Sequence, residues 1–116
     1  MRDFSDLTGT QWEMTSMIVA TAEFPGSPGD FNLEIGTKSV SGRSDCNLWS
    51  ADFLSGSDND LTIENMISTE IACPPTSIEG PYFDLLMRIS TFESVNKTLI
   101  LRADNFDQIM YRQIES

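Results

Sequence analysis

Cys46 and Cys73 are the residues of this 116-residue chain with the most distinctive chemistry. Positions 46 and 73 are 27 apart, which excludes a Cys-x-x-Cys redox motif. The chain contains no histidine, and two cysteines alone do not complete a tetrahedral zinc site. The residues therefore leave two alternatives, a pair of buried free thiols or a single disulfide.

The remaining polar side chains do not indicate catalysis. A nucleophile needs an adjacent base, and without histidine that base would be Lys, Asp or Glu. The 18 acidic residues form no recognisable catalytic pair, and the two lysines, Lys38 and Lys97, fall in expected turns. Gly26 and Gly29 flank prolines, and no Gly-Lys-Ser follows them, so there is no phosphate-binding loop. We therefore expect a protein that is not an enzyme, with no cofactor and no metal ion.

One candidate surface or ligand site lies around an expected turn and consists of Arg43, Asn47 and Trp49. Asn47 fits equally well as a turn residue that hydrogen-bonds local backbone. The neighbouring Gly42 indicates a backbone position with positive φ or a close approach of another chain segment. Five aromatic residues either form the core or line an apolar pocket: Trp12, Phe31, Trp49, Phe53 and Phe83.

Short segments of period two, separated by Gly, Pro, Ser, Asn and Asp, predict a mostly β protein. In the segment 11–20, alternation places Trp12, Met14, Ser16 and Ile18 on one face. The segment 23–30 contains two prolines and two glycines, and we expect it to lie outside the sheet. Further strands are expected at 31–35, 39–41, 47–53, 61–63, 92–95, 98–102 and 107–113.

The segment 77–90 departs from this pattern. Its apolar residues are spaced as one face of an α-helix: Ile78, Tyr82, Leu85, Leu86 and Ile89. Because Pro81 suits only a first turn, we expect the helix to run from about Gly80 to Ser90, capped by Ser77 or Thr76. The fold class is therefore α+β, dominated by β, with antiparallel strands and one helix.

Composition and charge limit the partners. With 7 basic and 18 acidic residues the net charge is −11, which argues against nucleic acid and against anionic lipid surfaces. No apolar run reaches the roughly 18 residues that span a bilayer, so we expect no direct membrane insertion. The length fits a single domain over residues 1–116, and we expect a monomer.

Four motifs occur in order along the chain, and together they resemble the META domain family, to which the bacterial heat-shock protein HslJ belongs. Leu7, Gly9 and Trp12 match a Leu-x-Gly-x-x-Trp motif. A (Val/Ile)-Ser-Gly then Cys-Asn-aromatic motif is matched by Val40, Ser41, Gly42, Cys46, Asn47 and, displaced by one place, Trp49. Thr-x-x-Ala-Cys is matched by Thr69, Ala72 and Cys73, and a helix followed by Leu-x-Leu is matched by Leu99 and Leu101.

The chain departs from the family pattern at three positions. Asp45 stands where a small glycine often precedes the motif cysteine, and Glu70 replaces a basic residue that often follows the motif threonine. Ala51 stands where a glycine is common. Any role tied to the basic residue is therefore not carried over to this chain.

The resemblance implies a curved antiparallel sheet or half-open β-barrel with one helix packed across it. It also implies that Cys46 and Cys73 lie within bonding distance, because the family keeps their two motifs together. The implied role is a non-catalytic binding or accessory one in envelope or stress physiology. Members are often exported or lipid-anchored, so we expect the cell envelope or periplasm if an export signal preceded this chain, and the cytoplasm otherwise.

Three functional alternatives stay open at the level of sequence. The first is a module that holds a protein partner at a sheet edge or in a groove beside the helix. The second is a carrier of a small apolar ligand or acyl chain between sheet and helix, since META domains are similar in shape to secretion-pilot lipoproteins. The third is a structural domain of a larger protein.

Overall fold

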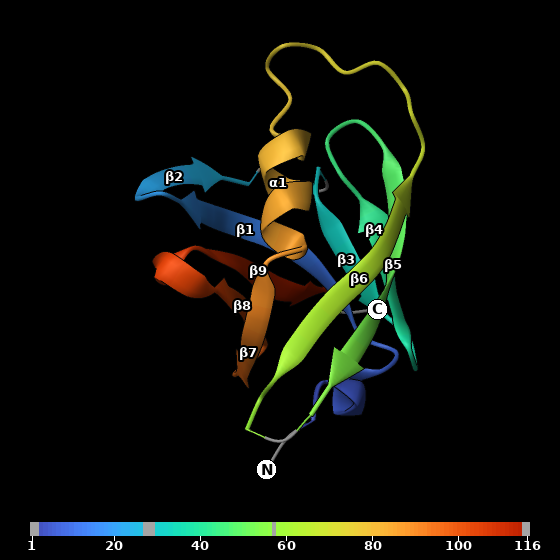
Figure 1. Cartoon of the computed structure of the whole chain (residues 1–116), viewed down its shortest axis with the longest axis vertical. Helices are drawn as coiled ribbons and strands as arrows, with labels where there is room; N and C mark the ends of the chain where they lie inside the picture. Colours follow the sequence, from blue (N-terminus) through green and yellow to red (C-terminus); the bar gives the residue numbers. More distant parts are fainter. Residues whose placement is uncertain (1–2, 27–29, 57, 115–116) are drawn as a thin grey trace.

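The computed structural model describes residues 3–26, 30–56 and 58–114, which form a curled antiparallel sheet with one α-helix, α1 (Glu79–Leu86) (Figure 1). The strands are β1 (Gln11–Val19), β2 (Ala22–Pro25), β3 (Asn32–Ile35), β4 (Ser39–Arg43), β5 (Leu48–Ser55), β6 (Leu61–Ser68), β7 (Ile89–Val95), β8 (Thr98–Ala103) and β9 (Gln108–Ile114). Their order is β6-β5-β4-β3-β1-β9-β8-β7, with β2 paired to β1. The predicted α+β, mostly β half-barrel with one helix is confirmed.

The two terminal strands of the sheet, β6 and β7, meet at one end of the barrel only. An isolated bridge joins Asp60 to Thr91, and the amide of Phe92 donates to the carbonyl oxygen of Asn59 at 3.1 Å. Towards the other end the strands diverge, and α1 lies in the opening (Figure 1). The segment between β6 and α1 loops over that end of the molecule.

Large side chains fill the interior from both ends. At the joined end, Phe4 of the short 3₁₀ helix η1 (Phe4–Leu7) contacts Phe53 and Phe92, with ring centroids 4.9 and 5.2 Å apart. At the helix end, the hydroxyl of Tyr82 lies 2.7 Å from that of Tyr111. Burial raises the pKa of both phenols well above the ordinary value, so both remain protonated. The five aromatic residues expected either in the core or around an apolar pocket belong to the core. Four are buried, Trp12, Phe31, Trp49 and Phe53, and Phe83 packs against them.

Strand β1 does not keep the simple alternation expected from its sequence. The register against β9 shifts between Met14 and Ser16, as a β-bulge does. As a result Met17 is completely buried, whereas Ser16 and Ile18 are only half-buried. The prediction that Ser16 and Ile18 share one face with Trp12 and Met14 is wrong, because the bulge moves the inward face by one residue.

Helix α1 is shorter than predicted. It ends at Leu86, the amide of Arg88 closes a turn on the carbonyl oxygen of Leu85 at 3.0 Å, and Ile89 then pairs with Ala103 in the sheet. Ile78, and not the predicted Ser77 or Thr76, occupies the N-cap position, but Ser77 Oγ still accepts a hydrogen bond from the amide of Glu79 at 3.2 Å. No helix in the described part of the chain is both long and apolar enough to cross a bilayer.

The segment after β1 also differs from expectation. Residues 22–25 form strand β2, which pairs with β1 through Val19↔Ala22 to Ser16↔Pro25, although we expected 23–30 to lie outside a sheet. Pro25 is tolerated because it ends a short strand beside a single partner, where its missing N–H removes little from the ladder. Residues 27–29 of the expected loop lie outside the described residues.

Candidate functional site

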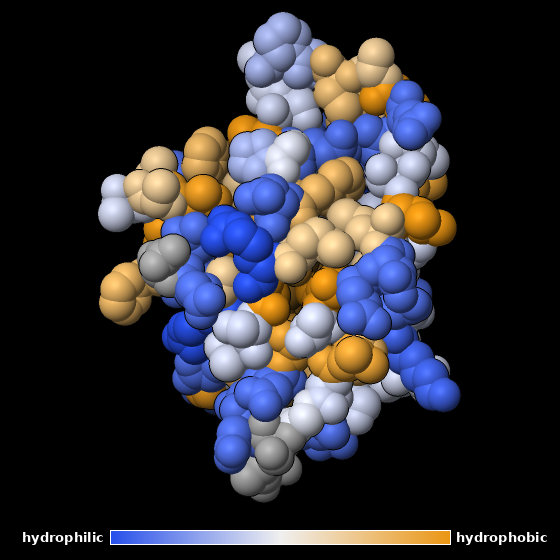
Figure 2. Space-filling model, viewed as in Figure 1, coloured by the Kyte–Doolittle hydropathy of each residue, from blue (hydrophilic) through white to orange (hydrophobic). Residues whose placement is uncertain are grey.

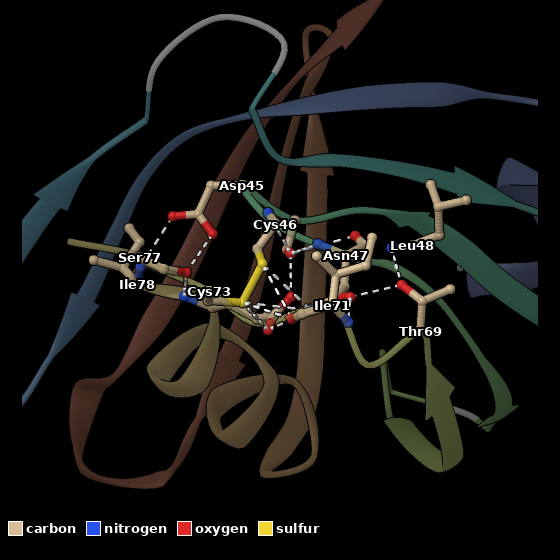
Figure 3. Close-up of a disulfide and its surroundings, with 11 residues drawn as sticks. Asp45, Cys46, Asn47, Leu48, Thr69, Ile71, Cys73, Ser77 and Ile78 are labelled. Carbon is tan, nitrogen blue, oxygen red and sulfur yellow. Dashed lines mark hydrogen bonds between the residues drawn. A yellow bond between two sulfur atoms is a disulfide. The ribbon is translucent and has the colours of Figure 1, made fainter. Parts of the chain in front are cut away.

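The disulfide and its surroundings form the most densely connected polar group of the described structure. Cys46 lies in the turn between β4 and β5, and Cys73 lies in the segment between β6 and α1. The structure joins them in a disulfide with the Cα atoms 5.8 Å apart (Figure 3). This bond fastens the segment that crosses the open end of the barrel to the β4–β5 turn.

Asn47 connects the same two segments through its side-chain oxygen. Oδ1 accepts a hydrogen bond from Thr69 Oγ1 at 2.7 Å and another from the amide of Ile71 at 2.8 Å. Thr69 Oγ1 in turn accepts from the amide of Leu48 at 3.1 Å. Because both partners of Oδ1 are donors, they fix the orientation of the amide group and point Nδ2 the other way.

The nitrogen of the Asn47 side chain points at the disulfide and at the start of the helix. Nδ2 donates to Glu79 Oε2 at 2.9 Å and to the carbonyl oxygen of Ile71 at 3.3 Å, and it lies 3.5 Å from both sulfur atoms. Asn47 is only 4% exposed, so these bonds satisfy a group that is almost completely removed from water.

Ser44 stabilises the turn between β4 and β5 through its side-chain hydroxyl. Its Oγ accepts from the amides of Cys46 and Asn47 at 3.1 and 2.9 Å and donates to Glu79 Oε1. Glu79 lies in the first turn of α1, where a carboxylate interacts favourably with the helix dipole. We call Ser44, Cys46, Asn47, Cys73 and Glu79 the disulfide cluster.

Asp45 adds a second attachment to the start of the helix. Its carboxylate accepts from Ser77 Oγ at 2.6 Å and from the amide of Ile78 at 3.0 Å (Figure 3). An aspartate at this position, where a glycine would have no side chain, therefore supplies an acceptor for a backbone group just before α1. The departure from the motif has a local structural role.

Of the predicted site residues Arg43, Asn47 and Trp49, the structure brings two together: Arg43 and Trp49 line one pocket of about 420 Å³, and Asn47 does not line it. Arg43 is exposed on β4, Asn47 is buried in the disulfide cluster, and Trp49 is 3% exposed. The indole ring of Trp49 lies 6.3 Å from the ring of Tyr82 and 6.2 Å from that of Phe83, within the core. Asn47 bonds a segment 22 and 24 residues away, which is not the local turn bonding that its sequence position suggests.

Gly42 has the structural role that its position suggested. A Cβ atom added there would lie 2.0 Å from the carbonyl oxygen of Asn32 on the neighbouring strand. Gly42 pairs with Leu33 on one side and with Trp49 on the other. The residue therefore marks a close approach between backbones, and not a ligand contact.

An exposed apolar surface lies next to the disulfide cluster. Leu48, Ile67 and Ile71 are 60%, 70% and 62% exposed, and we call these three residues the apolar edge. A shallow groove of about 330 Å³ lies here, lined by Leu48, Trp49, Ser50, Ile67, Ser68 and Thr69. Figure 2 shows apolar surface on the right-hand side, where Figure 1 places the upper end of β6.

The sequence that forms the apolar edge is acidic, although the exposed Arg43 of β4 pairs with Leu48 across the ladder. From Ser44 to Met87 the sequence contains no Lys and no Arg, against eight Asp and Glu. This stretch comprises β5, β6, the segment that carries Cys73, and α1. Sequence reasoning missed Ser44, Glu79 and the apolar edge. The gap in basic residues is the signal in the sequence that would have drawn attention to this region.

The sequence matches the META domain family over residues 5–115. The chain belongs to the META domain family. The likeness in motifs is therefore a true family relationship, and this META domain covers nearly the whole chain. None of the curated proteins matches the sequence significantly.

Solved structures share the fold of this META domain. An NMR structure of a protein from Burkholderia xenovorans is similar with a TM-score of 0.80 and 22% identity, over 95% of this chain and 85% of that one. A crystal structure of a DUF4847 family protein from Bacteroides vulgatus is similar with a TM-score of 0.66 and 13% identity, over 90% of this chain and 92% of that one. At these identities the likeness shows the fold alone.

Proposed function

We propose that this META domain is a non-catalytic module that binds an extended segment of a partner protein along β6 and the apolar edge. The observation that carries the proposal is the exposure of Leu48 at the start of β5, Ile67 at the end of β6 and Ile71 just beyond it, with Leu48 and Ile67 lining one groove. Contiguous exposed apolar side chains mark interaction sites on soluble domains.

The edge of the sheet supports an extended partner. Within the described residues, the ladder of β6 is formed with β5, and its hydrogen bonding with β7 lies at the joined end, at the Asp60–Thr91 bridge and the bond from Phe92 to Asn59. A terminal strand presents backbone N–H and C=O groups that can pair with an added strand, and pockets beside it accept alternate side chains. The groove under Ile67 is such a pocket.

Charge specifies the composition of the partner. Asp52, Glu64 and Glu70 lie on and just beyond β5 and β6, in the stretch without any basic residue. A second copy of this chain, with the same net charge of −11, would be repelled at this surface. The partner segment that fits is therefore one that alternates apolar and basic residues.

The packing of the interior favours this proposal over an apolar ligand carrier. Phe4, Trp12 and Tyr82 are at most 1% exposed, and they occupy the space between sheet and helix from both ends of the barrel. A small barrel filled by its own side chains has its binding surfaces on the outside.

The disulfide supports a location in an oxidising compartment, and we place the domain in the bacterial cell envelope. Alkylation of intact cells before lysis, followed by intact-mass measurement, tests this location. Both cysteines should remain unlabelled, and labelling of both would contradict it.

The binding proposal is tested with a short peptide of alternating valine and lysine, followed by fluorescence anisotropy. We expect saturable binding that weakens with salt, because the attraction between charges is screened. The same peptide with a central proline should not bind, because proline cannot complete a ladder. Equal affinity for the two peptides would contradict the proposal.

A pair of variants locates the peptide. Ile67→Ser removes an exposed apolar anchor without changing charge and should weaken binding about tenfold. Phe106→Ser is the matched control, because Phe106 is 95% exposed in the turn between β8 and β9, away from the apolar edge. Equal losses in the two variants would contradict the assignment to β6.

A further inference from the structure

Three potential metal-ligating groups converge in the disulfide cluster. One ligand atom each from Cys46, Cys73 and Glu79 lies within 4.8 Å of the others. Cys73 Sγ is 3.2 Å from Glu79 Oε2. In a tetrahedral zinc site with Zn–S and Zn–O distances of about 2.3 and 2.1 Å, neighbouring ligand atoms are about 3.6–3.8 Å apart. Once the S–S bond is broken, the two sulfur atoms must move apart, by rotation of their side chains, to reach that spacing.

We propose that the reduced form of this domain binds one soft divalent cation, such as Zn²⁺ or Cd²⁺, through Cys46, Cys73 and Glu79. A dithiol reductant supplies two electrons and two protons, breaks the S–S bond and is itself oxidised to a disulfide. The two thiols then lose their protons to solvent as the cation binds. The disulfide and the cation are therefore alternative occupants of the same place.

Asn47 orients the ligands of this site. Its Nδ2 donates to Glu79 Oε2 and lies 3.5 Å from each sulfur, while Thr69 and Ile71 fix the opposite end of the amide. An N–H group directed at a sulfur stabilises the thiolate over the thiol. Groups that hold metal ligands in this way contribute to affinity, and their loss typically costs about 10–100-fold.

The charge of the region favours a cation at the reduced site. Two thiolates beside the Glu79 carboxylate would place three negative charges together, in the stretch from 44 to 87 that has no Lys or Arg. A divalent cation relieves this repulsion. Cys73 is exposed, so solvent reaches the site and water is available as the fourth ligand.

Titration of the reduced protein with Cd²⁺ tests the proposal, with the ultraviolet thiolate-to-cadmium charge-transfer absorption as the readout. We expect one equivalent to bind to the reduced protein and none to the disulfide form. Glu79→Gln should weaken binding at least about tenfold. Glu23→Gln, which removes an exposed carboxylate from β2, should leave the affinity unchanged.

Two outcomes would overturn the proposal: Cd²⁺ absorption that is equal in the reduced and disulfide forms, or Glu79→Gln that binds as tightly as the unchanged chain. If reduction unfolds the protein, near-ultraviolet circular dichroism measures whether Cd²⁺ refolds it. There Cd²⁺ should restore the tryptophan and tyrosine signals of the folded state, and failure to restore them would equally contradict the site.

Discussion

Asn47 Oδ1 accepts a hydrogen bond from Thr69 Oγ1 at 2.7 Å, and this bond joins the turn before β5 to the residue that follows β6. Thr69 also accepts from the amide of Leu48, so one hydroxyl bridges a buried side chain and the backbone of the neighbouring strand. The two residues belong to different motifs, and their contact holds the apolar edge next to the disulfide.

We predict that Thr69→Val lowers the free energy of unfolding by about 1–3 kcal/mol, because Asn47 Oδ1 and the amide of Leu48 each lose a partner. Urea unfolding at neutral pH measures the change. Thr62→Val, at an exposed position of β6, is the matched control and should stay within about 0.5 kcal/mol of the unchanged chain. Similar effects of the two substitutions would contradict the role of Thr69.

Reduction of the disulfide should lower the free energy of unfolding by about 3.5 kcal/mol, the loop-closure value for a 27-residue separation. Urea unfolding with and without a phosphine reductant, in the presence of a chelator, measures the loss. Intact mass after denaturing alkylation provides the control and should show two labels only after reduction. An unfolding midpoint that does not change on reduction would contradict the contribution of the Cys46–Cys73 bond.

Two glycines should respond in opposite directions to the same substitution. Gly42→Ala forces a Cβ against the carbonyl oxygen of Asn32 and should cost about 1–3 kcal/mol. Gly80→Ala, in the first turn of α1 with nothing within 4 Å of the added atom, should gain up to about 1 kcal/mol. Thermal unfolding of both variants measures the difference, and a loss of stability in Gly80→Ala would be against expectation.

Asp107 should make stability depend on acid pH. The amide of Ala20 donates to its carboxylate at 2.8 Å and Arg88 donates at 3.0 Å, and these bonds hold the pKa of Asp107 below its ordinary value. The unfolded chain then takes up the proton first, so stability is present above about pH 4 and is lost as pH falls towards the folded-state pKa.

Replacing the carboxylate tests this dependence. Asp107→Asn should lower stability at neutral pH and flatten the fall in urea midpoint between neutral pH and about pH 3. Asp84→Asn is the control, since Asp84 contacts the same arginine from a side chain that is 73% exposed. An acid dependence in Asp107→Asn equal to that of the unchanged chain would exclude Asp107 as its source.

Local patterns predicted the elements in which side chains alternate without interruption. In β3, the buried residues Leu33 and Ile35 alternate with more exposed neighbours, and in β8 Leu99 and Leu101 do the same. The bulge in β1 was not predictable, because a single extra residue leaves no mark on composition. The predicted helix was about one turn too long, because Ile89 continues the helical spacing of apolar residues although it belongs to β7.

The candidate site was only partly predictable. The family resemblance predicted that Cys46 and Cys73 lie within bonding distance. The position of Asn47, by contrast, suggested hydrogen bonds within a local turn. Its actual partners, Thr69, Ile71 and Glu79, lie 22 to 32 residues away, and nothing in the nearby sequence specifies them. Long-range hydrogen bonds of this kind depend on the completed fold.

Hydrogen–deuterium exchange of the β6 amides, with and without the valine–lysine peptide, tests the proposed binding mode most directly. An added strand would hydrogen-bond the outer edge of residues 61–68, so exchange there should slow, whereas exchange in β8 and β9 should not change. Peptide binding that leaves exchange in β6 unchanged, or that slows it evenly over the whole domain, would contradict the account.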